Sequence, residues 1–215
     1  MDHFTQRVVL VGRISPGAVT LLGTGFFVGV EGLLVTSRHV VGNDAHGIVI
    51  IAPNINSFNQ YQDVSDKSCI PVSAEVVDIN PFADVVLLKV DAEVQGVSGL
   101  GSLDEVSVGE VLEIVGFPHC VDGRRVLTHQ SAAVGAKVLL DSSSVKIKHA
   151  VINSQTRPGQ SGSMVFSRRL NKIVGLLSGT YTPQGGGTVM LMGINPAELN
   201  QTSHIVSAEY IREMI

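Results

Sequence analysis

Pro158-Gly-Gln-Ser-Gly-Ser163 is the stretch that defines this chain, because it places one serine within a glycine-rich turn. Ser161 has Gly159 two positions before it and Gly162 directly after it. Glycine adopts backbone conformations that other residues avoid, so such a turn can aim several N–H groups at one point. We predict that Ser161 is a nucleophile and that the N–H groups of Gly159 and Ser161 form an oxyanion hole. Ser163 is the weaker candidate, since it lacks this pair of glycines.

A serine hydroxyl is a poor nucleophile at neutral pH and needs an imidazole base, which in turn needs a carboxylate to orient it. His39 lies in Thr36-Ser-Arg-His-Val40, where one helical turn is expected, and Asp84 directly precedes the apolar run Val-Val-Leu-Leu. We predict a triad of Ser161, His39 and Asp84. The alternatives are that His39 is a core histidine and that Asp84 is an ordinary turn carboxylate. Asp78 and Asp91 are rival candidates for the acid.

Six segments, taken in order, resemble the trypsin-like serine peptidases of the chymotrypsin fold, nearest to the HtrA/Deg proteases and the glutamyl endopeptidases. The resemblance runs from about Leu21 to Ile194. It implies an all-β fold of two six-stranded antiparallel β-barrels, and a serine endopeptidase that works through an acyl-enzyme. The segments are Gly23–Val28, Thr36–His39, Asp84–Lys89, Val115–Pro118, Thr156–Gly162 and Ile173–Ser178.

Specificity also follows from the resemblance. Gln155 stands at the floor of the expected S1 pocket, where trypsin-like preference for Lys or Arg would need an aspartate, and Leu177 replaces the histidine of glutamyl endopeptidases. We therefore predict an apolar or small P1 residue in a peptide bound as an extended strand. The residues expected to contact substrate are Gln155, Thr156, Leu177, Ser178, Gly179, Thr180, Met190 and Met192.

Composition fits one compact domain. The chain has 215 residues, 44% of them hydrophobic, and a formal net charge of −4, which argues against a nucleic-acid partner. No apolar run is long enough to span a membrane, and no secretory signal is evident, so we predict a cytoplasmic location. The two cysteines, Cys69 and Cys120, are predicted to be free thiols. No metal site and no cofactor are predicted, because the histidines lack ligand spacing.

Short strand-like runs place a first β-barrel at 1–97, which carries the base and the acid, and a second at 98–196, which carries the nucleophile and the S1 pocket. Residues 197–215 are predicted as a helical tail capped by Ser207. Gln160 stands where secreted trypsins hold the aspartate that pairs with a freed amine, so an activating protein partner is one way to order the loop. The alternative functions are a catalytically silent peptide-binding module and the protease domain of a larger viral or bacterial polyprotein.

Overall fold

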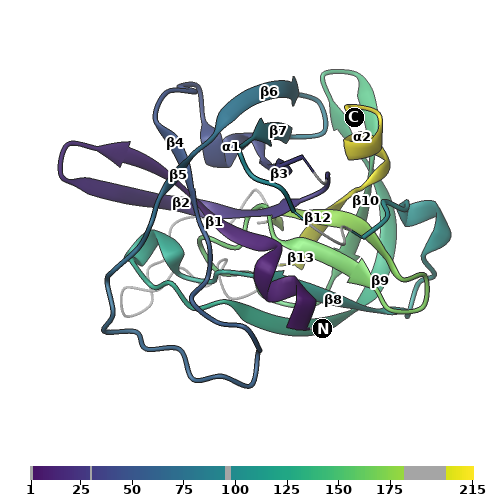
Figure 1. Cartoon of the computed structure of the whole chain (residues 1–215). Coiled ribbons are helices and arrows are strands. Elements are labelled where there is room, and N and C mark those ends of the chain that lie inside the picture. The colour runs from purple at the N-terminus through teal and green to yellow at the C-terminus, as the bar shows by residue number, and fades with distance from the viewer. Residues whose placement is uncertain (1, 30, 95–97, 182–201) are drawn as a thin grey trace, which may run out of the picture.

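The computed structural model describes residues 2–29, 31–94, 98–181 and 202–215, which form two β-units packed side by side (Figure 1). The first unit is a seven-stranded sheet in the order β5-β4-β1-β2-β3-β7-β6. The second is a closed barrel in the order β10-β13-β12-β11-β8-β9. The all-β, chymotrypsin-like fold predicted from the sequence is confirmed, with seven strands in the first unit where six were expected.

The strands of the first unit are β1 (Val8–Ser15), β2 (Ala18–Phe27), β3 (Leu33–Ser37), β4 (Ile48–Ile51), β5 (Val72–Ser73), β6 (Glu75–Asn80) and β7 (Val85–Lys89). A 3₁₀ turn, η1 (Asp2–Gln6), precedes them, and the one-turn helix α1 (Arg38–Val41) follows β3. The strands of the barrel are β8 (Val111–Gly116), β9 (Thr128–Ser142), β10 (Val145–Ile152), β11 (Met164–Ser167), β12 (Lys172–Tyr181) and β13 (Thr202–Ser207). The turns η2 (Leu103–Glu105) and η3 (Cys120–Asp122) and the helix α2 (Glu209–Arg212) complete the described chain.

One core cluster joins the two units. Phe26 of β2 and Val115 of β8 are both fully buried in it, together with Phe117, Met164 and Val206. Two further clusters fill the interiors of the first sheet and of the barrel. The shared cluster lies beside the loops that carry the candidate catalytic residues, so packing between the units also positions the site.

The C-terminal segment differs from the predicted helical tail. Thr202–Ser207 forms β13, which pairs with both β10 and β12 and thereby closes the barrel. Ser203, Ile205 and Ser207 are fully buried, which is the alternation of a strand and not the spacing of a helix. Helix α2 is shorter than expected, and Ala208 occupies its N-cap position without a side-chain hydrogen bond.

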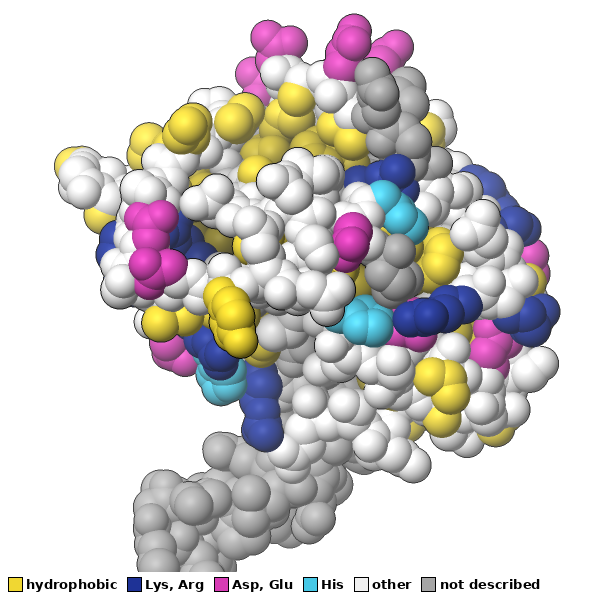
Figure 2. Space-filling view, turned by 60° about the horizontal axis from the view of Figure 1, so that its bottom comes forward, with side chains coloured by type: hydrophobic (Ala, Val, Ile, Leu, Met, Phe, Trp, Pro, Cys, Tyr) yellow, Lys and Arg dark blue, Asp and Glu magenta, His cyan; other side chains and the backbone are white. Residues whose placement is uncertain are grey.

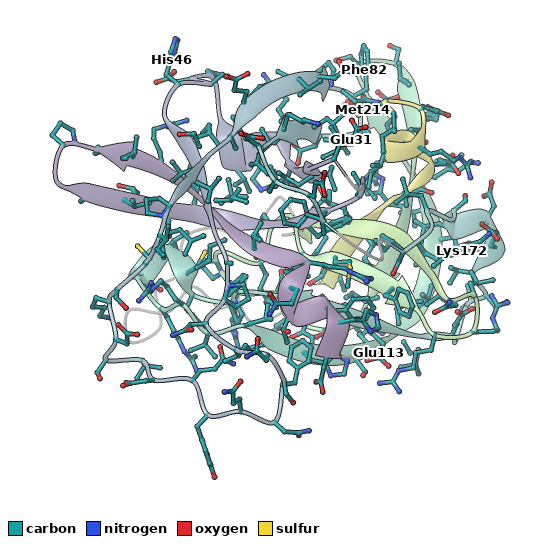
Figure 3. The ribbon with its side chains drawn as sticks, viewed as in Figure 1. Glu31, His46, Phe82, Glu113, Lys172 and Met214 are labelled. Carbon is teal, nitrogen blue, oxygen red and sulfur yellow. The ribbon has the colours of Figure 1, made fainter. Side chains whose placement is uncertain are left out.

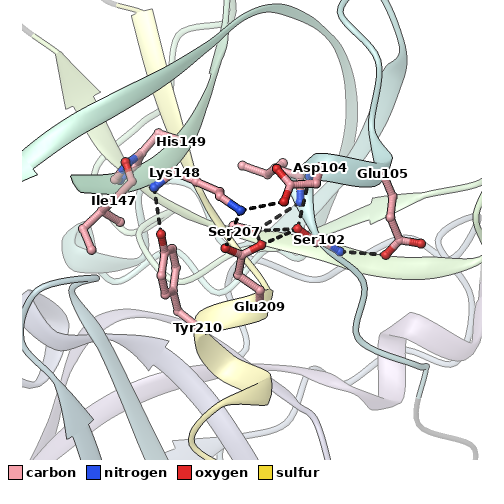
Figure 4. Close-up of polar contacts among 10 residues, drawn as sticks. Ser102, Asp104, Glu105, Ile147, Lys148, His149, Ser207, Glu209 and Tyr210 are labelled. Atoms are coloured by element: carbon pink, nitrogen blue, oxygen red, sulfur yellow. Dashed lines mark hydrogen bonds and ion pairs between the residues drawn. The ribbon is translucent and has the colours of Figure 1, made fainter. Parts of the chain in front are cut away.

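Helix α2 is attached to the barrel by a polar cluster (Figure 4). The Lys148 ammonium pairs with Asp104 at 2.6 Å and with Glu209 at 3.1 Å, while the backbone N–H of Lys148 donates to the Tyr210 hydroxyl at 2.9 Å. Ser102 also donates to the Glu209 carboxylate. The two acidic partners raise the pKa of Lys148 through hydrogen bonds, which keeps it charged.

Candidate active site

The predicted base and acid meet where α1 faces the start of β7. Nδ1 of His39 lies 2.5 Å from Oδ2 of Asp84, and the backbone N–H of His39 donates to Oδ1 of the same carboxylate at 3.0 Å. The Asp84 carbonyl accepts from Arg38 N–H at 2.9 Å. Asp84 has a φ of 56°, a left-handed conformation that costs energy for a residue other than glycine. Both Asp84 oxygens are thereby directed at His39.

Ser178 of β12 connects the acid to the nucleophile. Its hydroxyl donates to Asp84 Oδ2 at 3.5 Å, and its carbonyl accepts from the Ser161 hydroxyl at 3.4 Å. Ser161 is half-buried, and its hydroxyl makes no hydrogen bond to His39 in the described chain. Ser163, the rival nucleophile, is fully buried and donates to the Gln160 carbonyl at 2.6 Å, which is a structural role.

Tight packing shapes the turn at Gly159. Its φ is +91°, and an added Cβ would lie 2.6 Å from Cys120 Sγ and 2.8 Å from Phe117 O. The Gly159 carbonyl accepts from Thr24 Oγ1 at 2.9 Å, and the preceding Pro158 carbonyl accepts from His119 N–H at 2.6 Å. Both carbonyls are thus held by neighbouring segments, and a side chain at Gly159 is excluded by sterics.

The N–H groups of Gly159 and Ser161 donate to no acceptor among the described residues, whereas that of Gln160 donates to Arg157 O at 3.0 Å and that of Gly162 to Leu177 O at 2.8 Å. These two unpaired donors, on either side of the paired N–H of Gln160, are the ones predicted for an oxyanion hole.

Gln160 orders this loop with hydrogen bonds in place of an ion pair. Its side chain is 1% exposed. Its Oε1 accepts from the Arg157 N–H at 2.7 Å, and its Nε2 donates to Gln130 Oε1 at 3.4 Å. The amide therefore ties the loop to β9. Nε2 of Gln130 is buried without a hydrogen-bond partner in the part of the chain described here.

The residues predicted to contact substrate are only partly brought together by the described chain. Gln155 is exposed, Thr156 is buried, and Leu177 lies inside the barrel as part of its core. Ser178 and Gly179 are half-buried on β12, and Thr180 belongs to the same strand. Met190 and Met192 lie outside the described residues.

Ser203 is a residue that the sequence reasoning missed. It lies opposite Thr180 in the pairing of β12 with β13, and its hydroxyl donates to Ser154 O at 2.5 Å. The strand predicted to wall the S1 pocket, around Met190–Gly193, lies outside the described residues. The alternation of Thr202-Ser-His-Ile-Val-Ser207 was the signal that would have revealed the strand.

Among the described residues, three other histidines also pair with carboxylates. His46 bonds Asp44 at 2.9 Å and is almost fully exposed at the upper edge of the molecule (Figure 3). His119 lies 3.5 Å from Asp122, and His129 pairs with Glu113, which is placed near the lower edge in Figure 3. Of these pairs in the described chain, His39–Asp84 is the one that Ser178 links to Ser161.

The remaining chemistry of the described chain is limited. Cys69 is exposed and Cys120 is buried, and both are free thiols, as predicted. Burial raises the pKa of Cys120 to about 12, so this thiol is inert at neutral pH. No cluster of metal-ligating side chains is found in the described residues. In the same residues, every helix is too short and too polar to cross a bilayer.

Figure 2 shows acidic and basic side chains dispersed over one face of the molecule, without a broad patch of either charge.

Comparison with known proteins agrees with this geometry. Residues 23–176 match the family described as the trypsin-like peptidase domain. The chain belongs to this family. The trypsin-like domain is 31% identical over 165 residues to a probable periplasmic serine endoprotease DegP-like of Ectopseudomonas mendocina, an alignment covering 77% of this chain and 31% of that protein. A protein of the same description from Pseudomonas putida is 28% identical over 165 residues, covering 77% of this chain and 30% of its own length. The chain thus spans about a third of the length of these curated relatives.

Solved structures share the fold of the trypsin-like domain. The HtrA-type protease AlgW with a decapeptide aligns at a TM-score of 0.69 and 15% identity, over 98% of this chain and 63% of that one. The MamO protease domain of Magnetospirillum magneticum aligns at a TM-score of 0.69 and 16% identity, over 98% and 96% of the two chains. The predicted resemblance to trypsin-like and HtrA/Deg proteases is therefore confirmed, and family and relatives together support a serine endopeptidase.

The predicted cytoplasmic location is wrong. It was inferred from the lack of a recognisable signal segment, but the curated relatives that match are named periplasmic serine endoproteases. These names point to a periplasmic or secreted location.

Proposed function

We propose that this chain is a serine endopeptidase domain whose triad is Ser161, His39 and Asp84. The observation that carries the proposal is the hydrogen-bonded His39–Asp84 pair beside Ser161, whose own N–H and that of Gly159 are left without acceptors. We further propose that the domain works in the periplasm or outside the cell, as the names of its relatives suggest.

In the proposed reaction the Ser161 hydroxyl turns from Ser178 O to His39 Nε2 and attacks the scissile carbonyl carbon. His39 takes the hydroxyl proton, and Asp84 stabilises the imidazolium through Nδ1. The carbonyl oxygen becomes an oxyanion that accepts from the N–H groups of Gly159 and Ser161. His39 then returns the proton to the leaving amine as the C–N bond breaks. Water hydrolyses the resulting ester of Ser161 by the same route.

The substrate is proposed to bind as an extended strand along Ser178–Thr180 of β12. The Ser178 carbonyl lies 3.4 Å from the nucleophile, so a residue paired with it has its own carbonyl within reach of Ser161. The predicted substrate-contacting residues Gln155, Thr156, Ser178 and Gly179 carry no charge. This supports the predicted small or apolar P1 residue. We also propose that an activating protein partner turns the Ser161 hydroxyl toward His39.

The test is hydrolysis of a peptide library by the purified chain, read by mass spectrometry. We expect cleavage after small or apolar residues by the wild type, and no cleavage by Ser161→Ala or His39→Ala. A folded wild-type chain that binds library peptides without cutting them would favour the silent binding module. Cleavage that persists in Ser161→Ala would refute the triad.

A further inference from the structure

The outer edge of β6 has no partner strand in the described chain, and the proposed reaction does not use it. Strand β6 is the last strand in the order of the first sheet, and it pairs with β7 on its inner side. Figure 1 shows β6 along the upper margin of the first unit. The N–H of Ile79 donates to the carboxylate of the preceding residue, Asp78, at 2.8 Å, so a side chain satisfies this donor of the strand. An extended segment can add to such an edge by main-chain hydrogen bonds.

The two faces of β6 differ in chemistry. Glu75 and Asp78 share one face, because their partners on β7 are two residues apart, and both are exposed. Val76 and Ile79 share the other face by the same register, and Ile79 is 44% exposed. Val77, in the bulge between them, is 55% exposed. The edge is therefore acidic on one face and apolar on the other.

The acidic face carries uncompensated charge. Neither Glu75 nor Asp78 forms an ion pair with a cation among the described residues. Lys89 lies opposite Glu75 in the sheet, but its ammonium is 3.7 Å from the carboxylate of Glu31. The sequence from 68 to 88 contains no lysine, arginine or histidine. Charge complementarity at this edge therefore favours a basic ligand.

A second copy of this chain is disfavoured at the same edge. Antiparallel pairing of two β6 strands would bring the carboxylates of both copies onto adjacent strands, where like charges repel. The bulge between Val76 and Asp78 also twists the edge, which hinders pairing between identical edges. A partner with cations on that face is attracted where a second copy is repelled.

We propose that the outer edge of β6 binds an extended segment of a partner protein in which basic and apolar residues alternate. Main-chain hydrogen bonds extend the sheet by one strand, the basic side chains face Glu75 and Asp78, and the apolar side chains lie beside Ile79. The proposal does not depend on the endopeptidase function, although Asn80 at the end of β6 begins the turn that leads to Asp84.

The test is an NMR titration of Ser161→Ala, which is used so that the probes stay intact. Three acetylated peptide amides are compared: Lys-Val-Arg-Val-Lys-Val, the uncharged Gln-Val-Gln-Val-Gln-Val, and Lys-Val-Arg-Pro-Lys-Val, in which proline removes a strand donor. The first is expected to bind, to shift the amide signals of Glu75–Asn80 and to slow their exchange with solvent. The other two are expected to bind more weakly, the uncharged peptide by about two- to fivefold for each ion pair lost.

Glu75→Gln and Asp78→Asn are each expected to weaken binding of the basic peptide about two- to fivefold, the range of an exposed ion pair. Asp122→Asn is the matched control, because Asp122 is 70% exposed on η3, away from the first sheet, and the variant removes the same charge. It should leave the affinity unchanged. Equal affinity of all three variants, or binding that shifts the signals of β12 and leaves those of β6 unchanged, would overturn the proposal.

Sedimentation of the chain without peptide tests the competing occupant. We expect a monomer, since two acidic edges repel each other. A dimer that is lost in Val77→Lys would show that two β6 edges pair with each other, and it would refute the assignment of this edge to a basic partner.

Discussion

Replacement of Gly159 by alanine tests whether the oxyanion loop depends on close packing against its neighbours. The added Cβ would lie 2.6 Å from Cys120 Sγ, 2.8 Å from Cys120 N and 2.8 Å from Phe117 O, at a φ of +91°. Two of these three contacts are backbone atoms, which cannot move away as a flexible side chain does. The loop itself is therefore expected to shift.

The expected loss of stability has two sources. A left-handed conformation costs a non-glycine residue about 1–2 kcal/mol, and forcing extra volume into a packed site costs about 1–3 kcal/mol. We expect Gly159→Ala to lose about 2–5 kcal/mol of unfolding free energy. Displacement of one oxyanion donor is expected to reduce acylation on the order of 10²–10³-fold.

Gly109→Ala is the matched control. Gly109 has a φ of +88°, close to that of Gly159, but an added Cβ there meets nothing within 4 Å. This variant should lose only the conformational part, about 1–2 kcal/mol, and should keep its acylation rate. Unfolding in urea measures the stability, and the rate of labelling by a fluorophosphonate measures acylation. Equal labelling of Gly159→Ala and the wild type would refute the packing argument.

Three further predictions concern the triad, a buried histidine and the C-terminal helix. Asp84→Ala should label with fluorophosphonate more slowly than the wild type but faster than Ser161→Ala, which should not label; equal rates for Asp84→Ala and the wild type would exclude the acid from the triad. Burial lowers the pKa of His149, so the unfolded chain binds a proton there that the folded chain excludes. Stability should therefore fall as pH decreases below about 6.5, and His149→Phe should show a shallower fall in urea unfolding at pH 5–7; an unchanged slope would contradict this. Lys148→Ala should lower the melting temperature more than Lys146→Ala, whose single ion pair is exposed; equal melting temperatures would mean that the polar cluster does not hold α2.

Local sequence signals were sufficient where the chemistry depends on neighbours in the chain. The Gly159–Gly162 turn, the helical turn bearing His39 and the acid at the entrance to β7 were all predictable, since each depends on a few adjacent residues. The Asp84 backbone conformation was not, because it accompanies hydrogen bonds to Arg38 and His39 of α1, which lie far from Asp84 in the sequence.

Features that depend on tertiary pairing were missed. Residues 197–215 were predicted as a helical tail because Ser207 can cap a helix, and only the partners β10 and β12 show that Thr202–Ser207 closes the barrel. The segment at 52–71 carries no strong signal beyond polar residues. In the structure Gln62 bonds both the N–H and the carbonyl of Leu127, and Arg125 holds the carbonyls of Asp66 and Ser68, so this segment is tied to the barrel.

The measurement that tests the central claim most directly is intact-mass analysis after treatment with a fluorophosphonate. The triad and the oxyanion donors together predict one covalent adduct on the wild type and none on Ser161→Ala, with both proteins folded. A folded wild-type chain that forms no adduct, or an adduct that persists in Ser161→Ala, would contradict the assignment of Ser161 as the activated nucleophile.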